Sequence, residues 1–194
     1  MVFLVIEGFS GTGKTTLAKR FEQEGWMRMA ESAHAVPREV PVADRADTFA
    51  DYSLIGATMV YSSLISRFRE TRNLVSEGYL LSDLAYARVR FDLKKSDAYP
   101  SMLTICGKIL SHPQMKPDLY VLLKANPDII AERQSRKGDR ERIEDDFFMT
   151  RYYSALAEIH EALGERNVET VLSDSHSEET FARVKSLLGD GKRA

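Results

Sequence analysis

The sequence is poor in cysteine and contains no long apolar run. Its one cysteine, Cys106, cannot form a disulfide within the chain, which fits a reducing compartment and predicts a cytoplasmic protein. The apolar residues 1–6 are followed by Glu7 and carry no basic leader, so they are too short for a signal peptide or a membrane span. We therefore expect no membrane partner and interpret residues 2–6 as a buried strand.

An excess of one charge sign is also missing. The chain has 27 basic and 29 acidic side chains, a formal net charge of -2, whereas a protein that binds a nucleic-acid backbone is normally strongly basic. We therefore expect no nucleic-acid partner. The 194 residues show no repeat or linker, and 43% hydrophobic with 29% charged residues is ordinary for a soluble globular protein. Residues 1–194 are predicted to form a single domain.

Short apolar runs alternate with segments of helical periodicity. The runs predict five strands, at residues 2–6, 26–30, 73–77, 119–124 and 168–172. Helices are predicted at residues 14–24, 48–72, 82–94, 100–111, 127–136, 144–163 and 178–188, with a loop at 33–47. This order favours right-handed βαβ crossovers and an α/β fold of three layers, αβα, in which a parallel five-stranded sheet has helices on both faces. Ligands in such sheets bind at the carboxyl ends of the strands.

Residues 8–15, GFSGTGKT, match the P-loop (Walker A) pattern GxxxxGK[ST] and lie between a predicted strand and a predicted helix, which disfavours a chance glycine-rich turn. Glycines let successive N–H groups face phosphate oxygens, and the helix adds the positive end of its dipole. The lysine reaches the β- and γ-phosphates, and the last threonine hydroxyl ligates Mg²⁺, so ATP and Mg²⁺ are the predicted cofactors. The predicted cofactor-binding residues are Gly8, Ser10, Gly11, Thr12, Gly13, Lys14, Thr15 and Thr16, with helix packing as the favoured alternative for Thr16.

An arginine-rich segment follows the fourth predicted strand. The chain lacks the NKxD segment of GTPase switches, and it lacks the LSGGQ or apolar-Asp-Glu motifs of transporter and AAA-type ATPases. We predict a lid at about residues 133–146, in which Arg133 binds the nucleotide. Arg136, Arg140 and Arg142 would stabilise the transferring phosphoryl group and exclude water. A solvated basic turn is the alternative.

Four segments, in this order, resemble the thymidylate kinases and the related deoxynucleoside kinases. They are the P-loop, residues 76–86 (SEGYLLSDLAY), residues 117–123 (PDLYVLL) and residues 133–144, which end in ERIE. Tyr79, Ser82, Ala85 and Tyr86 keep the spacing of the DRYxxSxxAYQ motif of the thymidylate kinases. The resemblance covers about residues 1–153. It implies a mononucleotide-kinase fold, ATP with Mg²⁺ as donor, and a small acceptor between the lid and the helices after strands two and three.

The chain departs from the thymidylate kinases at three places. It has Glu77-Gly78 where they usually carry Asp-Arg, Ser10 where they commonly carry a carboxylate, and ESAHA at residues 31–35 where they carry Arg-Glu-Pro-Gly-Gly. These departures disfavour dTMP as the acceptor. Deoxynucleoside kinases place a glutamate at the end of the second strand as general base, and the resemblance gives this role to Glu31. An alcohol benefits from such a base, whereas a phosphate is already anionic.

Other candidates keep two interpretations. Glu31 is a catalytic base, a surface carboxylate or a helix-cap partner, and Glu77 is a metal residue, an acceptor contact or a structural ion pair. His34 and Arg38 contact an anionic acceptor or lie on the loop surface. Aromatic residues at helical spacing line the acceptor pocket or belong to the core: Tyr52, Tyr61, Tyr79 and Tyr86.

Together these observations predict an ATP-dependent small-molecule kinase that phosphorylates a hydroxyl of a small anionic metabolite. Phosphorylated alcohols such as mevalonate 3-phosphate, on which some similar archaeal chains act, and nucleosides are the candidate acceptors. The alternatives are a thymidylate or other nucleoside monophosphate kinase and, less favoured, a nucleotide-dependent switch or binding module. The sequence leaves a homodimer open.

Overall fold

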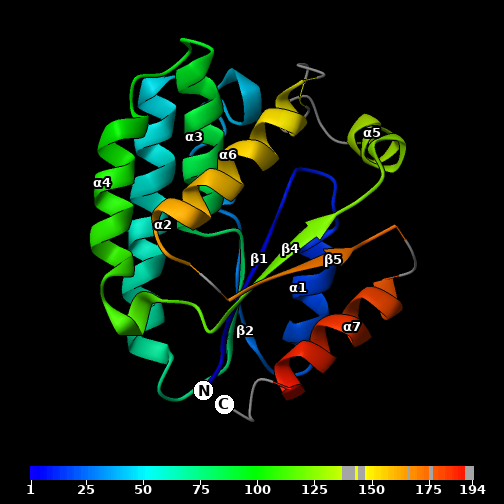
Figure 1. The fold of residues 1–194 in the computed structure, drawn as a ribbon. Coiled ribbons are helices and arrows are strands. Elements are labelled where there is room, and N and C mark those ends of the chain that lie inside the picture. The colour runs from blue at the N-terminus through cyan, green and yellow to red at the C-terminus, as the bar shows by residue number, and fades with distance from the viewer. Residues whose placement is uncertain (137–142, 144–146, 166, 175–176, 191–194) are drawn as a thin grey trace.

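The computed structural model describes residues 1–136, 143, 147–165, 167–174 and 177–190. Within these residues five strands form one parallel sheet in the order β2-β3-β1-β4-β5 (Figure 1). The strands are β1 (Phe3–Gly8), β2 (Met27–Met29), β3 (Leu74–Glu77), β4 (Leu119–Lys124) and β5 (Val168–Leu172). The predicted α/β fold with a parallel five-stranded sheet is confirmed.

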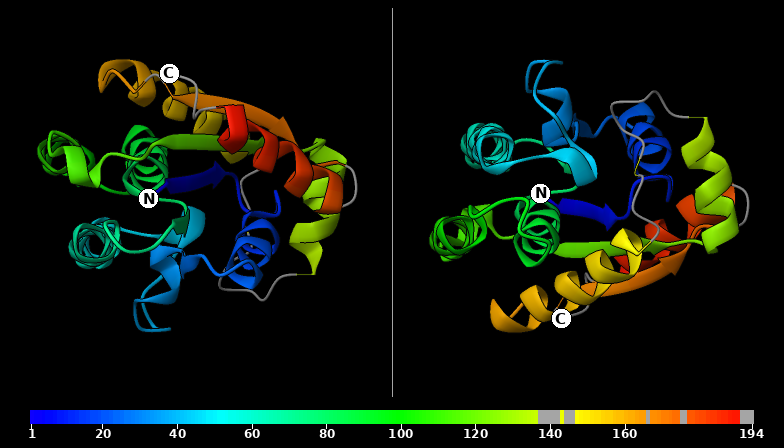
Figure 2. Two further views of the ribbon diagram at one scale, coloured as in Figure 1. Left: turned by 90° about the horizontal axis from the view of Figure 1, so that it is seen from below. Right: turned by 90° about the horizontal axis from the view of Figure 1, so that it is seen from above.

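The α-helices of the described residues cover both faces of the sheet (Figure 2). One face carries α2 (Thr48–Phe68), α3 (Leu80–Asp92), α4 (Tyr99–Leu110) and α6 (Phe148–Ala162). The other face carries α1 (Lys14–Gln23) and α7 (Ser177–Asp190), while α5 (Pro127–Ser135) lies beyond the end of β4. In the described part of the chain, no helix combines the length and the apolar character that crossing a membrane requires.

The central strand β1 shows why the sheet needs two helical layers. All six of its residues are buried, so the strand reads as a continuous apolar run and not as an alternation. Phe3 and Val5 pack into the core on the side of α3 and α6, whereas Leu4 and Ile6 pack into the core on the side of α1 and α7. Burial on both faces fixes β1, and with it the P-loop that follows.

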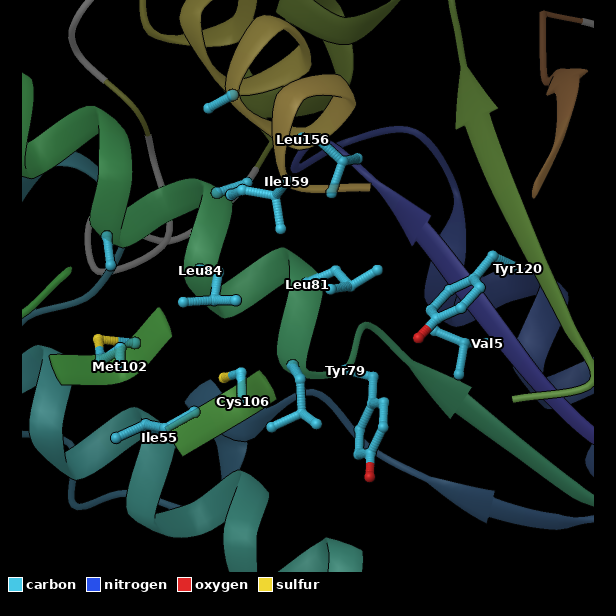
Figure 3. Packing of buried hydrophobic residues seen from close by; sticks show 14 of the residues in the cluster. Val5, Ile55, Tyr79, Leu81, Leu84, Met102, Cys106, Tyr120, Leu156 and Ile159 are labelled. Atoms are coloured by element: carbon cyan, nitrogen blue, oxygen red, sulfur yellow. The ribbon is translucent and has the colours of Figure 1, made fainter. Parts of the chain in front are cut away.

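Helix α3 lies at the centre of the larger core. Its Leu81 and Leu84 lie among Met102 and Cys106 of α4 and Ile159 of α6 (Figure 3). Cys106 is buried as a free thiol, and the same surroundings raise its pKa above the ordinary value through desolvation. Because α3 is fixed on several sides, the polar side chains at its start are held rigidly below the P-loop.

The structure moves several predicted boundaries. Helix α2 ends at Phe68 and not at residue 72, and the guanidinium of its C-cap residue Arg69 binds the backbone oxygens of Pro113, Gln114 and Lys116. Helix α3 begins at Leu80, two residues before the prediction. The predicted loop 33–47 contains two short 3₁₀ turns. Helix α6 begins at Phe148, and residues 144–146 of its predicted range lie outside the described residues.

Candidate active site

The P-loop, residues 8–15, joins the carboxyl end of β1 to α1 (Figure 1). Gly8 adopts φ 146°, and a Cβ at this position would lie 2.7 Å from the backbone oxygen of Leu123 on β4. A side chain is therefore excluded here by both backbone conformation and space. Gly13, at φ 97°, is the N-cap of α1, so the helix begins where the loop ends and its first N–H groups face the loop.

A donor cavity of about 360 Å³ opens over the loop. Its lining includes seven of the predicted cofactor-binding residues, Gly11, Thr12, Gly13, Lys14, Thr15, Thr16 and Arg133. Thr16 is exposed toward this cavity, so the favoured interpretation of Thr16 as helix packing was wrong. Gly8 is buried beneath the loop, and Ser10 faces a second cavity. The volume is in the range of small-molecule sites.

Lys14 is buried and folded back onto its own loop. Its Nζ donates to the backbone oxygen of Gly8 at 2.9 Å and lies 3.5 Å from that of Phe9. It also lies 3.7 Å from Oε1 of Glu31. The lysine charge is therefore compensated by protein groups, and phosphate binding exchanges these contacts for phosphate oxygens.

Oxygen ligands for a hard cation meet beside the loop. The Thr15 hydroxyl donates to Oε2 of Glu77, and Arg28 on β2 donates from Nε to Oε1 of Glu77 at 2.5 Å. Two of the three interpretations of Glu77, the ion pair and the metal residue, thus have a counterpart, since the carboxylate pairs with Arg28 and also accepts from the P-loop threonine. A threonine hydroxyl and one carboxylate suit Mg²⁺, which completes its octahedron with water and substrate phosphates. Within the described residues, no group of three or more His, Cys, Asp or Glu side chains forms a separate metal cluster.

Glu31 stands at the end of β2, where it precedes the 3₁₀ turn Ser32–His34. It is half-buried and lines the donor cavity as well as the second cavity on the far side of Lys14. A carboxylate that borders both cavities is placed to touch a group that enters from either one. The sequence analysis named Glu31, and the structure places it between the donor cavity and the second cavity.

The second cavity lies between the loop after β2, α2 and α3, and its volume of about 50 Å³ is below that of a complete small-molecule site. Its lining is Ser10, Glu31, Ser32, Ala33, His34, Val42, Ala43, Leu54, Asp83, Tyr86 and Arg90. Of the weaker candidates, His34 and Tyr86 line it. Tyr79 belongs to the core, with its hydroxyl 2.9 Å from Oγ of Ser62. Arg38 and Tyr52 are exposed, and neither is among the lining residues.

Asp83 is the residue of this cavity that sequence reasoning missed. It is buried on α3 and accepts hydrogen bonds from Ser32, at 2.9 Å, and from Thr58 on α2. Desolvation raises the pKa of Asp83 to about 7, against the two hydrogen bonds, which lower it. The only signal in the sequence is an acidic residue within the apolar first turns of a helix, and this does not reveal the partners.

A buried ion pair closes the cavity on one side. Arg90 on α3 donates Nε to Asp51 on α2 at 3.3 Å and makes a second, shorter contact from Nη2. Its Nη1 donates to the backbone oxygen of Ala43 at 2.5 Å. Ala43 adopts φ 59°, a conformation that non-glycine residues rarely take. The pair therefore fixes α2, α3 and the intervening loop relative to one another.

A second buried acid lies below the P-loop. Glu7, the residue before Gly8, accepts a hydrogen bond from Ser82, and desolvation raises its pKa well above the usual range. Its Oε1 has no hydrogen-bond partner among the described residues. Burial thus favours the protonated form of this carboxyl, while the nearby charge of Lys14 opposes the shift.

Comparison with known proteins identifies the type of enzyme. No known protein-family profile matches the chain. A probable thymidylate kinase of Methanospirillum hungatei is 26% identical in an alignment of length 174 that covers 81% of each chain. A solved thymidylate kinase of Candida albicans superposes with a TM-score of 0.73 at 17% identity, over 98% of this chain and 92% of that one. A deoxyadenosine kinase of M. mycoides superposes with a TM-score of 0.69 at 13% identity, over 97% and 99%.

The chain is an ATP-dependent P-loop kinase. It resembles the thymidylate and deoxynucleoside kinases, and the predicted resemblance is confirmed.

Arg133, at the base of the predicted lid, is hydrogen-bonded to the backbone of the P-loop of this kinase. Arg133 on α5 donates from Nη1 to the backbone oxygen of Gly11 at 3.2 Å and from Nη2 to that of Ser173 at 3.1 Å. Arg136 instead lies at the helix end, is 73% exposed and pairs with Glu132 at 2.5 Å. Arg140 and Arg142 lie outside the described residues. Of the four lid arginines, the structure therefore brings Arg133 to the donor cavity.

Proposed function

We propose that this kinase transfers the γ-phosphoryl group of ATP to a hydroxyl of a small acceptor in the second cavity, with Glu31 as general base. The observation that carries the proposal is the position of Glu31. It borders both cavities, 3.7 Å from the P-loop lysine, so it lies where donor and acceptor would meet. A phosphate acceptor would need no base at this point, whereas an alcohol would.

In the proposed reaction, Lys14 and the loop amides bind the triphosphate and stabilise charge on the transferring group. Mg²⁺, held by Thr15 and Glu77, would neutralise phosphate charge when bound. Glu31 accepts the proton of the acceptor hydroxyl as its oxygen bonds to the γ-phosphorus. The bond from the γ-phosphorus to the bridging oxygen breaks, and ADP leaves. Arg136, Arg140 and Arg142 would complete the site from the lid, where guanidiniums spread over the transferring oxygens.

The charges of the second cavity favour a neutral acceptor. Its described lining contains two carboxyl groups, Glu31 and Asp83, and the charge of its one guanidinium, Arg90, is compensated by buried Asp51. A phosphorylated acceptor such as mevalonate 3-phosphate gains little there, so the predicted anionic acceptor receives less support than a nucleoside. The carboxyl of Asp83 would accept a hydrogen bond from an amino group, such as that of deoxyadenosine. The name of the deoxyadenosine kinase that shares this fold agrees with this choice.

A nucleoside monophosphate kinase is the second candidate, because the curated relative at 26% identity is named a probable thymidylate kinase. Against it stands Gly78, which occupies the position of the arginine expected in thymidylate kinases. The backbone there adopts φ 69°, so this position favours glycine over any side chain.

We further propose that residues 1–194 act as one cytoplasmic domain that forms a homodimer through α2. Phe49 and Val60 on this helix are 70% and 60% exposed, and Tyr52 and Met59 add to the same apolar surface. Multi-angle light scattering of the protein and of Val60→Glu would decide between dimer and monomer. A monomeric wild type would contradict the proposal.

The acceptor is identified by measuring ADP release from ATP with deoxyadenosine, deoxycytidine, thymidine, dTMP and mevalonate 3-phosphate. We expect the two nucleosides with an exocyclic amino group to react fastest and dTMP to react slowly. Turnover of dTMP that equals or exceeds that of every alcohol would overturn the hydroxyl proposal and identify a nucleotide kinase.

A further inference from the structure

The backbone of Ser10, in the P-loop, is hydrogen-bonded on both sides of its Cα. Its N–H, part of the Phe9–Ser10 peptide, donates to the hydroxyl of Tyr86 on α3 at 3.2 Å. Its carbonyl oxygen, part of the Ser10–Gly11 peptide, accepts from Nε2 of Gln134 on α5 at 2.7 Å. In Figure 1 the loop between β1 and α1 lies between α3 and α5, so this one residue connects the acceptor side of the site to the base of the lid.

Both side chains are themselves held in place. The ring of Tyr86 stacks on Phe148 at a centroid distance of 5.8 Å and on Phe9 at 6.3 Å, and Arg90 lies 5.7 Å from its centroid. Gln134 is buried, 8% exposed, on a helix whose neighbouring Arg133 holds the next carbonyl of the loop. Neither hydrogen bond is an incidental surface contact. Each comes from a side chain with little freedom to move.

The backbone of Ser10 leads directly into the residues of the P-loop that line the donor cavity. Gly11 to Thr15 follow it directly and line the donor cavity, and the direction of their N–H groups depends on how the loop leaves Ser10. Tyr86 also lines the second cavity, as does Ser10. A contact made there therefore reaches the donor loop through a single hydrogen bond.

We infer that Tyr86 and Gln134 are positioning residues that together hold the backbone of Ser10, so that the loop amides face the donor phosphates. Neither residue is assigned a role in the chemistry. The two act as a pair because they fix the two consecutive peptides that meet at the Cα of Ser10, and loss of either hydrogen bond leaves this residue free to turn. This inference does not depend on the identity of the acceptor, since it concerns the donor loop.

The test uses MgADP, which binds without an acceptor, so its outcome does not depend on the proposed acceptor chemistry. The dissociation constant is measured by calorimetry for the wild type, Tyr86→Phe, Gln134→Met and the double variant. Loss of one hydrogen bond to a backbone group weakens binding by about fivefold for each single variant. Two independent contacts would give about 25-fold in the double variant, whereas joint restraint of one residue predicts a clearly smaller loss, close to that of one single variant.

Tyr79→Phe is the matched control. It removes a buried hydroxyl from the residue that precedes the same helix, where the partner is Ser62 and not the P-loop. We expect a comparable fall in melting temperature and a dissociation constant for MgADP within about twofold of the wild type, as for a contact with no link to the loop. If Tyr79→Phe weakened MgADP binding as much as Tyr86→Phe does, general destabilisation would explain both effects, and the inference would be overturned.

Two further outcomes would also overturn it: an unchanged dissociation constant in both single variants, or full additivity in the double variant. Hydrogen exchange keeps the inference testable if Tyr86→Phe does not fold. In the nucleotide-free wild type the amide of Ser10 should be protected, and Gln134→Met should speed its exchange while the amides of β5 stay unchanged. An unprotected Ser10 amide in the wild type would contradict the proposed restraint.

Discussion

The donor and acceptor sides of the active site are built in opposite ways. The donor side is one continuous stretch of backbone, residues 8–15, which curls around the place of the phosphates. The acceptor side is assembled from side chains of separate segments, with Glu31 after β2, Leu54 on α2, and Asp83 on α3. The first is set by local backbone conformation, and the second only by tertiary packing.

The two sides also differ in charge. Backbone N–H groups, the start of α1 and Lys14 make the donor side positive, whereas buried carboxyl groups dominate the described lining of the acceptor side. Substitutions on the donor side should therefore act on any phosphate ligand. Substitutions on the acceptor side should change specificity and pH dependence.

The largest effect is expected on the donor side. Lys14→Ala should abolish measurable phosphotransfer, because it removes a charge-assisted contact to the transferring group that contributes at least about 10³-fold. Circular dichroism should show an intact fold. Lys19→Ala, an exposed lysine on the same helix, is the control and should be silent. A Lys14 variant within about tenfold of the wild-type rate would disprove the donor site.

Glu31→Gln tests the junction between the two sides. Removal of a general base should lower kcat by about 10²–10⁴-fold while the affinity for MgADP changes little. Steady-state kinetics with the best acceptor and calorimetry with MgADP measure the two quantities. Glu39→Gln, an exposed glutamate in the loop after β2, should behave like the wild type. A silent Glu31→Gln would leave this carboxylate without a catalytic role.

Arg136→Ala tests the proposed lid. This side chain pairs with Glu132 at the helix end, so it reaches the phosphates only if that pair opens. We expect kcat to fall by about tenfold and the KM for ATP to change less, because a lid guanidinium binds the transition state more tightly than the ground state. Arg183→Ala, an exposed arginine on α7, is the control. A change in KM alone would make this residue a binding contact and not a catalytic one.

The smallest effect concerns the stability of the acceptor side. Because the pKa of Asp83 is raised to about 7 in the folded state, its protonated form adds stability that is complete below its unfolded pKa, near 4, and is lost as pH rises through 7. Asp83→Asn removes this dependence. Between pH 5.5 and 8, the melting temperature of the wild type should fall by about 3 °C more than that of the variant. Asp92→Asn, exposed on the same helix, should follow the wild type. Parallel curves for Asp83→Asn and the wild type would contradict the raised pKa.

This contrast explains how much could be predicted from the sequence. The sheet was predictable because its central strands β3, β1 and β4 carry short apolar runs that alternate with helical segments, and β1 is buried on both faces. The donor loop was predictable because its residues are contiguous and their order has one structural meaning. Glu31 was found through the resemblance and not from its own surroundings, and the catalytic roles proposed from the sequence remain predictions.

The acceptor side could not be predicted in the same way. Asp83 meets Ser32 and Thr58 only after α2 and α3 have packed together, across 51 and 25 residues of chain. The pair of Asp51 and Arg90 is likewise invisible in a pattern of charges. Thr16 was misjudged because helical periodicity does not tell which face of a first turn borders a cavity. The C-cap residue of α2, Arg69, binds a loop more than 40 residues away, and no sequence pattern shows this contact.

The close packing at Gly8 has a consequence for protein engineering. The joint between the loop and β4 leaves no room for even a methyl group, so position 8 and the backbone of Leu123 form a fixed point in any variant library. Several side chains of the acceptor lining are not among the nearest neighbours of position 8: Ala33, His34, Val42 and Leu54. A library that randomises these positions would therefore explore new acceptors while the nucleotide-binding half of the enzyme keeps its geometry.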